Sequence, residues 1–356
     1  MRFMLFAFVI CAFLADIGHA DDLSQSKNAS AKLPIVFGGF IDTYYVYDFN
    51  NPANHDRSFT TQPSRHNEFN VNLTFVDAKL STEQLRGRLA LQTGTSVQSN
   101  YSSEPTLGQH IQEAVIGYRV TDKLWIDGGI YLSHIGFESW ISKENWTYTR
   151  SLAADFSPYY QSGVKATYQW TDTLSTQLHV LNGWQNISEK NGNKALGLQI
   201  AYNPNPQLSF TYNNFFGNEV GSQWRFFNDL IAKVALTPTI QIAAIYDIGL
   251  QQTSGGESAA VWQTYGAFVR YQFTPRLSFT ARGEQFFDRN QVIVATGTAN
   301  GFLTTGTSIN ADVTLHEQAL WRTELRGLWS KDSIYPKGLG TSTSNGFIVT
   351  SLSLWF

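Results

Sequence analysis

Apolar and polar residues alternate with a period of two along segments of about ten residues, from Ile35 to the end of the chain. This period puts successive side chains on opposite faces of a β-strand. The polar face carries Asn, Gln, Thr, Arg and Gly, whereas the outer face of a soluble β-sandwich would carry more Lys and Glu. The pattern predicts strands with one apolar and one polar face, most clearly in residues 85–92, 264–273, 277–284 and 321–329.

Short and long connections alternate between these segments. The short turns are near 77–83, 120–124, 170–174, 202–208, 236–240, 273–277 and 316–319. The longer polar segments are near 48–66, 95–109, 134–157, 186–194, 217–225, 251–262, 288–308 and 330–345. Outer-membrane barrels have an even number of strands, short periplasmic turns and longer external loops. We therefore predict an all-β fold, a single closed antiparallel transmembrane β-barrel of about 16 strands, with 14 or 18 as alternatives because the strands around 194–230 and 306–318 are the least distinct.

The composition agrees with one face in lipid and one in water. Aromatic residues make up 14% of the chain, charged residues only 15%, and the net charge is -3. A soluble domain has about 25% charged residues, and a mean hydropathy of -0.21 is too polar for a bundle of membrane helices. Lipid cannot satisfy backbone hydrogen bonds, so a sheet within it must close on itself. Sixteen strands would enclose an aqueous lumen.

The N-terminal residues resemble a secretory signal peptide. Arg2 precedes an apolar run from Phe3 to Ala15, and small residues precede a cleavage site after Ala20. The run is too short for a transmembrane helix, and the bulky residue before Cys11 disfavours a lipoprotein. We expect residues 1–20 to be the signal peptide, 21–34 a flexible periplasmic segment and 35–356 the barrel. Cys11 is the one cysteine, so the mature chain would contain neither disulfides nor Cys-ligated metals.

The C-terminal strand carries a second export signal. Apolar residues alternate up to Phe356, the last residue, as in strands that the barrel-assembly machinery of Gram-negative bacteria recognises. Aromatic residues also gather near the predicted membrane boundaries, where rings with a polar edge suit the headgroup layer. We predict a girdle, mainly periplasmic, of Trp125, Tyr168, Trp170, Tyr202, Tyr271, Phe273, Trp321 and Trp355.

Five stretches, in this order, resemble a family of outer-membrane β-barrel porins, the OmpL-like group. They are residues 37–52 (FGGFIDTYYVYDFNNP), 132–138 (LSHIGFE), 157–163 (SPYYQSG), 180–184 (VLNGW) and 322–326 (RTELR). The resemblance spans nearly the whole mature chain and implies a passive channel without a defined substrate. Trp329 and Lys331 stand where an acidic residue is expected after Gly327, so no role near Arg326 is transferred from the family.

Selectivity in a channel comes from charged side chains at its narrowest point. The expected basic lumen residues are Arg86, Arg88, Arg119, Arg270, Arg282, Arg322 and Arg326, with Lys165. The expected acidic residues of the lumen or constriction are Asp42, Glu113, Glu138, Glu144, Asp155, Glu284 and Glu324, with Glu68, Asp127 and Asp247. Because the last strand pairs with the first, Arg282, Arg322, Arg326, Arg86 and Arg88 would form one contiguous basic wall. Pairing of these arginines with Glu284 and Glu324, to satisfy the barrel interior, is the structural alternative.

The longest loop, near 134–157, is expected to fold into the lumen, where its carboxylates would face the basic wall across the pore. The alternative is an exposed external loop whose aromatic residues Trp140, Trp146 and Tyr148 bind a partner. That alternative corresponds to a structural or adhesive barrel rather than a porin for small hydrophilic solutes or ions. Either kind of barrel is compatible with a homo-oligomer.

Enzymatic function is not expected. The chain contains no GxSxG, HExxH or P-loop motif, and neighbours such as Ser133 and His134 would point to opposite faces of a strand. An outer-membrane hydrolase is the least favoured alternative. His55, His66 and His110 fall in predicted external loops as weak candidates for metal binding. We expect no cofactor and no nucleic-acid partner.

Overall fold

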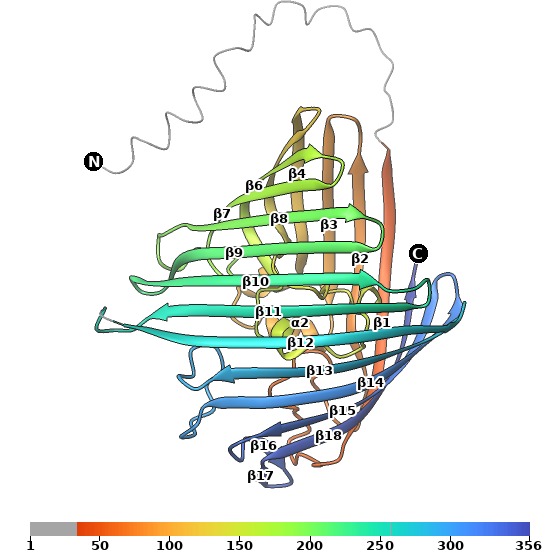
Figure 1. The fold of residues 1–356 in the computed structure, drawn as a ribbon, viewed down its shortest axis with the longest axis vertical. Coiled ribbons are helices and arrows are strands. Elements are labelled where there is room, and N and C mark those ends of the chain that lie inside the picture. The colour runs from red at the N-terminus through yellow and green to blue at the C-terminus, as the bar shows by residue number, and fades with distance from the viewer. Residues whose placement is uncertain (1–33, 257) are drawn as a thin grey trace, which may run out of the picture. The chain divides into compact units, whose positions relative to one another are not determined.

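The computed structural model describes residues 34–256 and 258–356, and within them sixteen strands form one closed antiparallel barrel (Figure 1). The first eight in chain order are β1 (Ile35–Asp48), β2 (Phe69–Ser81), β3 (Leu85–Thr93), β4 (Ile111–Thr121), β5 (Leu124–Leu132), β6 (Tyr160–Thr171), β7 (Leu174–Leu181) and β8 (Ala195–Asn205). The others are β9 (Leu208–Val220), β10 (Gln223–Ala235), β11 (Ile240–Gln252), β12 (Ala259–Thr274), β13 (Leu277–Asp288), β14 (Phe302–His316), β15 (Ala319–Ser330) and β18 (Ser344–Trp355). The predicted fold and strand number are confirmed.

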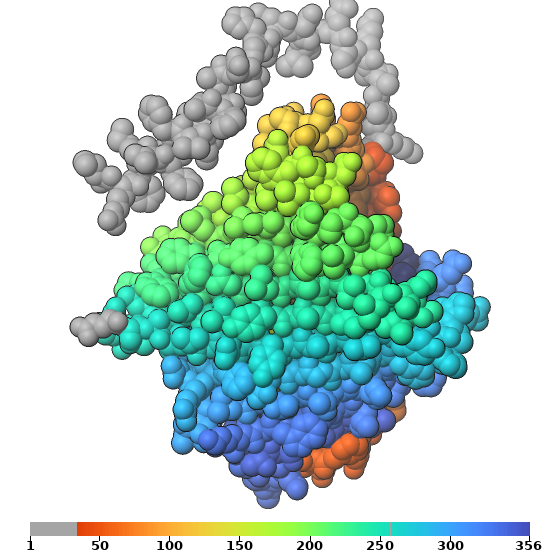
Figure 2. All heavy atoms as spheres, viewed as in Figure 1, coloured from red at the N-terminus to blue at the C-terminus, as the bar shows by residue number. Residues whose placement is uncertain are grey.

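Each barrel strand pairs with its neighbours along the chain, and β1 pairs with β18 to close the wall. At this seam Phe40 lies opposite Trp355 and Asp48 opposite Phe347. Successive strands follow one another as bands across the face shown in Figure 2, from green to blue. The predicted signal peptide with its cleavage site at Ala20, and residues 21–33 of the predicted periplasmic segment, lie outside the described residues.

Five of the seven predicted short turns contain a threonine whose hydroxyl accepts backbone hydrogen bonds, a feature that the sequence analysis did not single out. Thr121 Oγ1 accepts hydrogen bonds from the backbone N–H groups of Lys123 and Leu124, at 3.3 and 3.1 Å. The hydroxyls at 171, 237 and 274 accept two such bonds each, and the hydroxyl at 82 accepts one. A hydroxyl that binds nearby backbone N–H groups stabilises a tight turn. Threonine thus acts alongside the Asp and Pro on which the prediction rested.

The long connections differ most from the prediction at one place. The loop expected near 217–225 is a tight turn at 221–222, because β9 and β10 continue the alternating pattern to Val220 and from Gln223. Gly221 has a φ of 59°, which glycine adopts without steric cost. Other loops hold short elements: α2 (Thr95–Asn100), α3 (Thr106–Gln109), η1 (Ser142–Glu144), α4 (Leu152–Asp155), and the hairpin of β16 (Tyr335–Lys337) and β17 (Gly340–Ser342).

The outer face of the barrel is apolar and exposed, as the alternation predicted. Exposed residues of β15 and β18 include Trp321, Leu325 and Ile348, whereas their chain neighbours Arg322 and Glu324 are fully buried. None of the helices in the described part of the chain is long and apolar enough to cross a membrane. The wall therefore presents to its surroundings the surface that a lipid bilayer requires.

Two residues assigned to the aromatic girdle face the lumen. Trp125 lies directly opposite Arg119, and the Arg86 guanidinium lies 4.4 Å from the centre of its ring. Trp355 lies opposite Phe40 and packs inside the barrel. The alternation of side chains along each strand places both residues on the inner face. This alternation is therefore a better guide to their orientation than closeness to a turn. Among the other members, Trp170, Tyr202, Tyr271, Phe273 and Trp321 are exposed.

Candidate functional site

Residues 133–159, between β5 and β6, are packed against inward-pointing side chains of distant strands. Ser142 Oγ donates to the Asp42 carboxylate of β1 at 2.7 Å. The Arg322 guanidinium of β15 donates to the carbonyl oxygens of Ser142 and Asn145, at 2.6 and 2.7 Å. It also binds Asp312 of β14 at 2.7 Å. These partners lie on the inner wall, so we name residues 133–159 the inner loop.

A second anchor lies at Thr149, further along the inner loop. Its backbone N–H and its hydroxyl both donate to the Glu324 carboxylate, at 2.6 and 2.9 Å. Arg282 of β13 donates to the Thr149 carbonyl oxygen at 2.8 Å and to Glu324 at 2.9 Å. Thr149, Arg282 and Glu324 are almost completely buried. The backbone and the side chains of the loop therefore form hydrogen bonds with charged side chains of this wall.

A third anchor fixes the start of helix α4. The Glu284 carboxylate of β13 accepts from the backbone N–H of Leu152 at 2.6 Å and from the Arg326 guanidinium at 2.6 Å. Arg326 also donates to the Arg150 carbonyl oxygen at 2.8 Å. In this network, charges removed from water are matched by opposite charges and hydrogen bonds. Removing one partner of such a network leaves an uncompensated buried charge, which is strongly destabilising.

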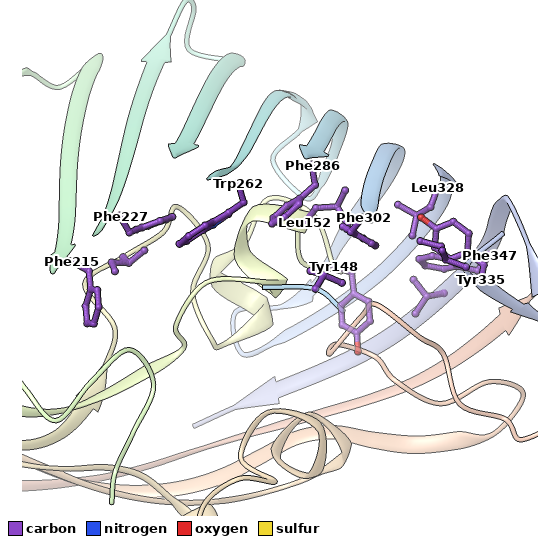
Figure 3. Close-up of a cluster of buried hydrophobic side chains, with 14 of the residues drawn as sticks. Tyr148, Leu152, Phe215, Phe227, Trp262, Phe286, Phe302, Leu328, Tyr335 and Phe347 are labelled. Carbon is purple, nitrogen blue, oxygen red and sulfur yellow. The ribbon is translucent and has the colours of Figure 1, made fainter. Parts of the chain in front are cut away.

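The loop also covers a row of aromatic side chains that crosses the inner wall from β9 to β18. Figure 3 shows Phe215, Phe227, Trp262, Phe286 and Phe302, from β9, β10, β12, β13 and β14, with Leu152 beside them. All of these side chains are buried. Trp262 packs over Gly249, where a Cβ atom would lie 2.0 Å from the indole. The row therefore provides an apolar surface on which the loop packs, beside its charged anchors.

The predicted basic residues fall into two groups instead of one contiguous wall. Arg282, Arg322 and Arg326 line β13 and β15, whereas Arg86 and Arg88 lie on β3. Strands β18, β1 and β2 separate the groups, and they contribute the acidic side chains of Asp42, Asp48 and Asp77. The predicted order of these strands around the barrel is correct. Acidic residues on the inner face of the intervening strands separate the two groups of arginines.

The second group is paired as well. Arg86 binds Asp127 with its Nε 2.6 Å from the carboxylate. Arg88 binds Asp77 at 2.7 Å and also forms an ion pair with Glu113. The predicted pairing of the arginines with carboxylates thus extends along both groups. Glu284 and Glu324, named for this role from the sequence, neutralise only the first.

The remaining predicted basic residues lie on β4, β6 and β12. Arg119 binds the Asp122 carbonyl oxygen at 3.0 Å, and Arg270 lies 3.4 Å from the Ser278 hydroxyl. Lys165 lies with its Nζ 4.6 Å from the centre of the Tyr131 ring. Within the described chain none of Arg270 and Lys165 has a carboxylate within the 4.0 Å of an ion pair. Arg270, close to a short turn, and Lys165, in the middle of β6, are therefore two basic side chains of the described lumen without a carboxylate partner.

The three acidic residues predicted on the loop have different surroundings. Glu138 accepts from the Ser151 backbone N–H at 2.8 Å and lies 3.9 Å from Arg282, so it does face the first basic group. Asp155 instead accepts from Thr61 of the loop after β1, and Glu144 is exposed beside Lys143. Burial raises the pKa of the Glu138 and Asp155 carboxyl groups above their ordinary values.

Several charged residues of this site were not singled out from the sequence. Asp48 shares the inward parity of Asp42, and Asp77 the parity of its strand, so the period of two could have revealed both. Arg57 and Arg150 lie in loops, where no such period exists. Arg57 binds Asp48 at 3.4 Å, and the Arg150 guanidinium stacks 4.1 Å from the Tyr159 ring centre.

Several histidines of the described chain are bound or stacked within the protein. Ser133 Oγ accepts from the Ile135 backbone, whereas His134 Nδ1 is 2.8 Å from Gln161. His55 and His66 stack with ring centres 5.7 Å apart. Among residues 34–256 and 258–356, no group of three or more His, Cys, Asp and Glu is arranged to hold a metal ion.

Phe356 lies at the barrel seam with its side chain exposed on the outer face. Its backbone N–H donates to the Gly39 carbonyl oxygen at 3.2 Å, and the Gly39 N–H donates back at 3.1 Å. A Cβ atom at residue 39 would lie 2.5 Å from the Phe356 ring. The terminal residue therefore lies against the first strand, where glycine leaves room for it.

Comparison with known proteins agrees with this architecture. A family model described as "Putative beta-barrel porin-2, OmpL-like" matches residues 34–356, which is the whole barrel. No curated protein matches the sequence.

Solved structures of outer-membrane channels share the fold at low sequence identity. An anion-selective porin from Comamonas acidovorans is 10% identical, with a TM-score of 0.61 over 90% of this chain and 99% of that one. The outer-membrane channel DcaP of Acinetobacter baumannii is 11% identical, with a TM-score of 0.58 over 90% and 97%. OmpF of Salmonella typhi is 13% identical, with a TM-score of 0.58 over 90% and 97%. At these identities the similarity is one of fold.

Proposed function

Because this chain belongs to the β-barrel porin-2, OmpL-like family, a family of outer-membrane channels, we propose that small hydrophilic solutes or ions diffuse passively through its lumen. The inner loop forms the constriction of this channel. One observation carries the proposal: residues from 142 to 152 are hydrogen-bonded to inward side chains of β1, β13, β14 and β15. A loop that starts on β5 and is fixed to strands on another part of the wall must narrow the passage between them.

The anchors make this constriction rigid. Arg282, Arg322 and Arg326 are held by carboxylates of neighbouring strands and by loop carbonyl oxygens, and all three are buried. Each of these arginines is fixed beside a carboxylate, so a passing ion experiences the positive and the negative charge of the pair together. The selectivity of the channel then depends on the balance between these pairs and the unpaired basic residues near the short turns.

The adhesive alternative is less well supported. It was motivated by the aromatic residues of the loop, but Trp140 and Tyr148 are buried, with 2% and 1% of their surfaces exposed. Side chains that pack inside the barrel are not available to an external partner. We also propose that the barrel has no catalytic activity, since the Ser133–His134 pair is not hydrogen-bonded and the family is one of channels.

Two partners follow from the proposed location. The exposed Phe356 at the end of an alternating apolar strand suits recognition by the barrel-assembly machinery. The apolar outer face would contact outer-membrane lipid and, in a homo-oligomer, a second copy of the chain. The assembly signal ends at the seam, so a complex that reads it would hold the strand that closes the barrel.

The test is the conductance of the refolded protein in planar lipid bilayers. The ends of the inner loop are adjacent, because Leu132 pairs with Tyr160 and the Ser133 N–H donates to the Tyr159 carbonyl. Residues 135–157 can therefore be replaced by a short Gly-Ser linker without parting β5 from β6. We expect stepwise conductance from the wild type and larger steps from this variant.

A matched control removes exposed residues 189–193 of the loop between β7 and β8. Its conductance should equal that of the wild type. Heat-dependent gel mobility shows whether each variant has folded. Folded wild-type protein that conducts no current would refute the channel, and unchanged steps after replacement of the inner loop would refute the constriction.

A further inference from the structure

A recess of about 410 Å³ opens on the inner wall beside the short turns, between the inner loop and strands β8 to β11. Its wall carries inward positions of these strands, among them Asn203, Ser209, Lys233 and Gln241, and Trp146 of the inner loop lies against it. Small side chains at Ser209 and Ala235 leave the space open. The volume is in the range of pockets that hold small organic molecules, about 300–1,000 Å³.

The polar groups of this recess are free to bind a solute. In the described part of the chain, Lys233 Nζ and the indole N–H of Trp146 have no hydrogen-bond partner, and neither do the side-chain amides of Asn203 and Gln241. Lys233 is exposed, and Trp146 is partly exposed. The anchors of the inner loop are hydrogen-bonded to other groups of the protein. The polar side chains of this recess make no such bonds, so they differ from the anchors.

The charge of the recess is positive. No acidic residue lines it, and Lys233 forms no ion pair with any described carboxylate. Arg270 on β12 lies directly opposite Gln241, and it too has no carboxylate within 4.0 Å. Elsewhere on the inner wall the anchoring arginines are neutralised by carboxylates, as in the pair of Arg322 with Asp312. An anion entering the lumen from this side therefore meets its first unpaired cations here.

We propose that this recess is a binding site for hydroxylated organic anions of sugar size, such as uronates. The ammonium group of Lys233 binds the carboxylate. The amides of Asn203 and Gln241 donate to and accept from hydroxyl groups, because an amide offers both kinds of partner. The indole of Trp146 supplies an apolar face and an N–H donor. This inference rests on the proposed channel function and names a class of solute for it.

The location gives the site a role in passage through the channel. The turn between β8 and β9, with Pro206 and Gln207, forms part of its rim. Short turns are periplasmic in outer-membrane barrels, so the recess lies where the lumen opens toward the periplasm. A solute that has passed the constriction would bind here before release, with weak affinity, since a channel site must also let its solute leave.

The experiment measures binding and passage separately, with glucuronate as the probe and glucose as the neutral comparison. Saturation-transfer NMR on the folded protein in detergent measures binding without any need for conductance. Planar bilayers measure interruption of the current by glucuronate. We expect glucuronate to bind more tightly than glucose. Lys233→Gln should weaken glucuronate binding about tenfold, as expected for loss of a charge-assisted hydrogen bond, and should raise the half-blocking concentration by the same factor.

Two further variants separate the site from general effects of charge and packing. Lys79→Gln removes an exposed lysine from the inner wall of β2, where it is paired with Asp77 at 3.2 Å, and should leave binding unchanged. Trp146→Phe keeps an aromatic ring against Phe137, which Trp146 contacts edge to face. It removes the indole donor and part of the aromatic face, so binding should weaken about threefold.

Each outcome has a distinct meaning. Equal binding of glucuronate and glucose, or an unchanged affinity in Lys233→Gln, overturns the site even if the protein conducts. Binding that depends on Lys233 in a protein without conductance supports the site and overturns the channel. A loss of affinity as large in Lys79→Gln as in Lys233→Gln would show a general effect of lumen charge and would also overturn the site.

Discussion

The guanidinium of Arg322 donates to the carbonyl oxygen of Ser142 at 2.6 Å, although 180 residues separate them in the chain. The same guanidinium binds Asp312 at 2.7 Å, so it joins the inner loop to two strands of the wall. A side chain with five donors in a fixed plane can serve several acceptors at once. Arg322 is therefore the contact whose loss should affect both the stability of the barrel and the width of its lumen.

Arg322→Ala should lower the free energy of unfolding by about 3–5 kcal/mol, because it leaves Asp312 buried without its partner. It should also raise single-channel conductance by releasing residues 142–145. Urea unfolding in lipid vesicles and bilayer recordings measure the two effects. Arg322→Lys retains the charge but not the planar set of donors, so it should recover only part of the loss. Arg276→Ala, at an exposed turn, is the control, and an equal effect there would contradict the assignment.

A pair of glycine substitutions tests whether the row of aromatic side chains beneath the inner loop contributes to stability. Gly249→Ala would bring a Cβ atom to 2.0 Å from the buried Trp262 ring, whereas nothing lies within 4 Å of a Cβ at Gly283. Overpacking of this kind costs about 1–3 kcal/mol. We therefore expect Gly249→Ala to lower the urea midpoint and Gly283→Ala to leave it within error. Equal midpoints for the two variants would show that the packing of Trp262 does not contribute to stability.

Replacing both Arg86 and Arg88 with Ala should shift ion preference toward cations. Their partners Asp77, Glu113 and Asp127 would remain on the wall without compensating charge. The reversal potential under a salt gradient measures the change. Substitution of Arg276 alone removes a charge outside the lumen and should leave the potential unchanged. A shift toward anions in the double variant would contradict the predicted sign.

The carboxyl group of Glu138 should make stability depend on pH. Burial raises its pKa in the folded protein above the value in the unfolded chain. The folded state then binds this proton more tightly, so the group lowers stability increasingly as pH rises through the range above the ordinary carboxyl pKa. The unfolding free energy of Glu138→Gln, relative to that of the wild type, should rise as pH increases above the ordinary carboxyl pKa of about 4.3. A difference that is constant with pH would refute this.

Deletion of Phe356 should reduce the amount of folded barrel in the outer membrane while leaving the inner loop contacts unchanged. The residue packs at the seam on Gly39, outside the lumen. In cells, heat-modifiable protein in the membrane fraction should fall severalfold. In vitro, refolding without assembly machinery should be affected much less. An equal loss in both settings would assign Phe356 a purely structural role.

The period of two was enough to predict the wall of the barrel, and its limits are visible in single residues. It placed Arg322 and Glu324 inside and Trp321 outside correctly. Trp355 was assigned to the girdle because it is aromatic and close to a boundary, although its parity points inward, where it lies opposite Phe40. The polar residues around Gly221 suggested a loop, but backbone pairing of β9 with β10 continues almost to the turn.

The contacts within the lumen were less accessible to prediction. Glu138 faces Arg282 as expected, but on the loop itself the anchoring arginines bind mainly backbone carbonyl oxygens, as at Ser142 and Asn145. Every residue type carries such an oxygen, so the sequence contains no mark of which ones are used. Arg150 lies in a loop without periodicity, and its stacking on Tyr159 depends on the conformation of the whole loop.

The double attachment of Ser142 has a consequence for the order of folding. Its hydroxyl binds Asp42 on the first strand and its carbonyl oxygen binds Arg322 on β15, and these strands come close only when β18 has joined them. Residues 142–145 thus cannot reach their final place in an open sheet. In the proposed channel, the narrowest part of the lumen would therefore form last, after β1 and β18 have paired.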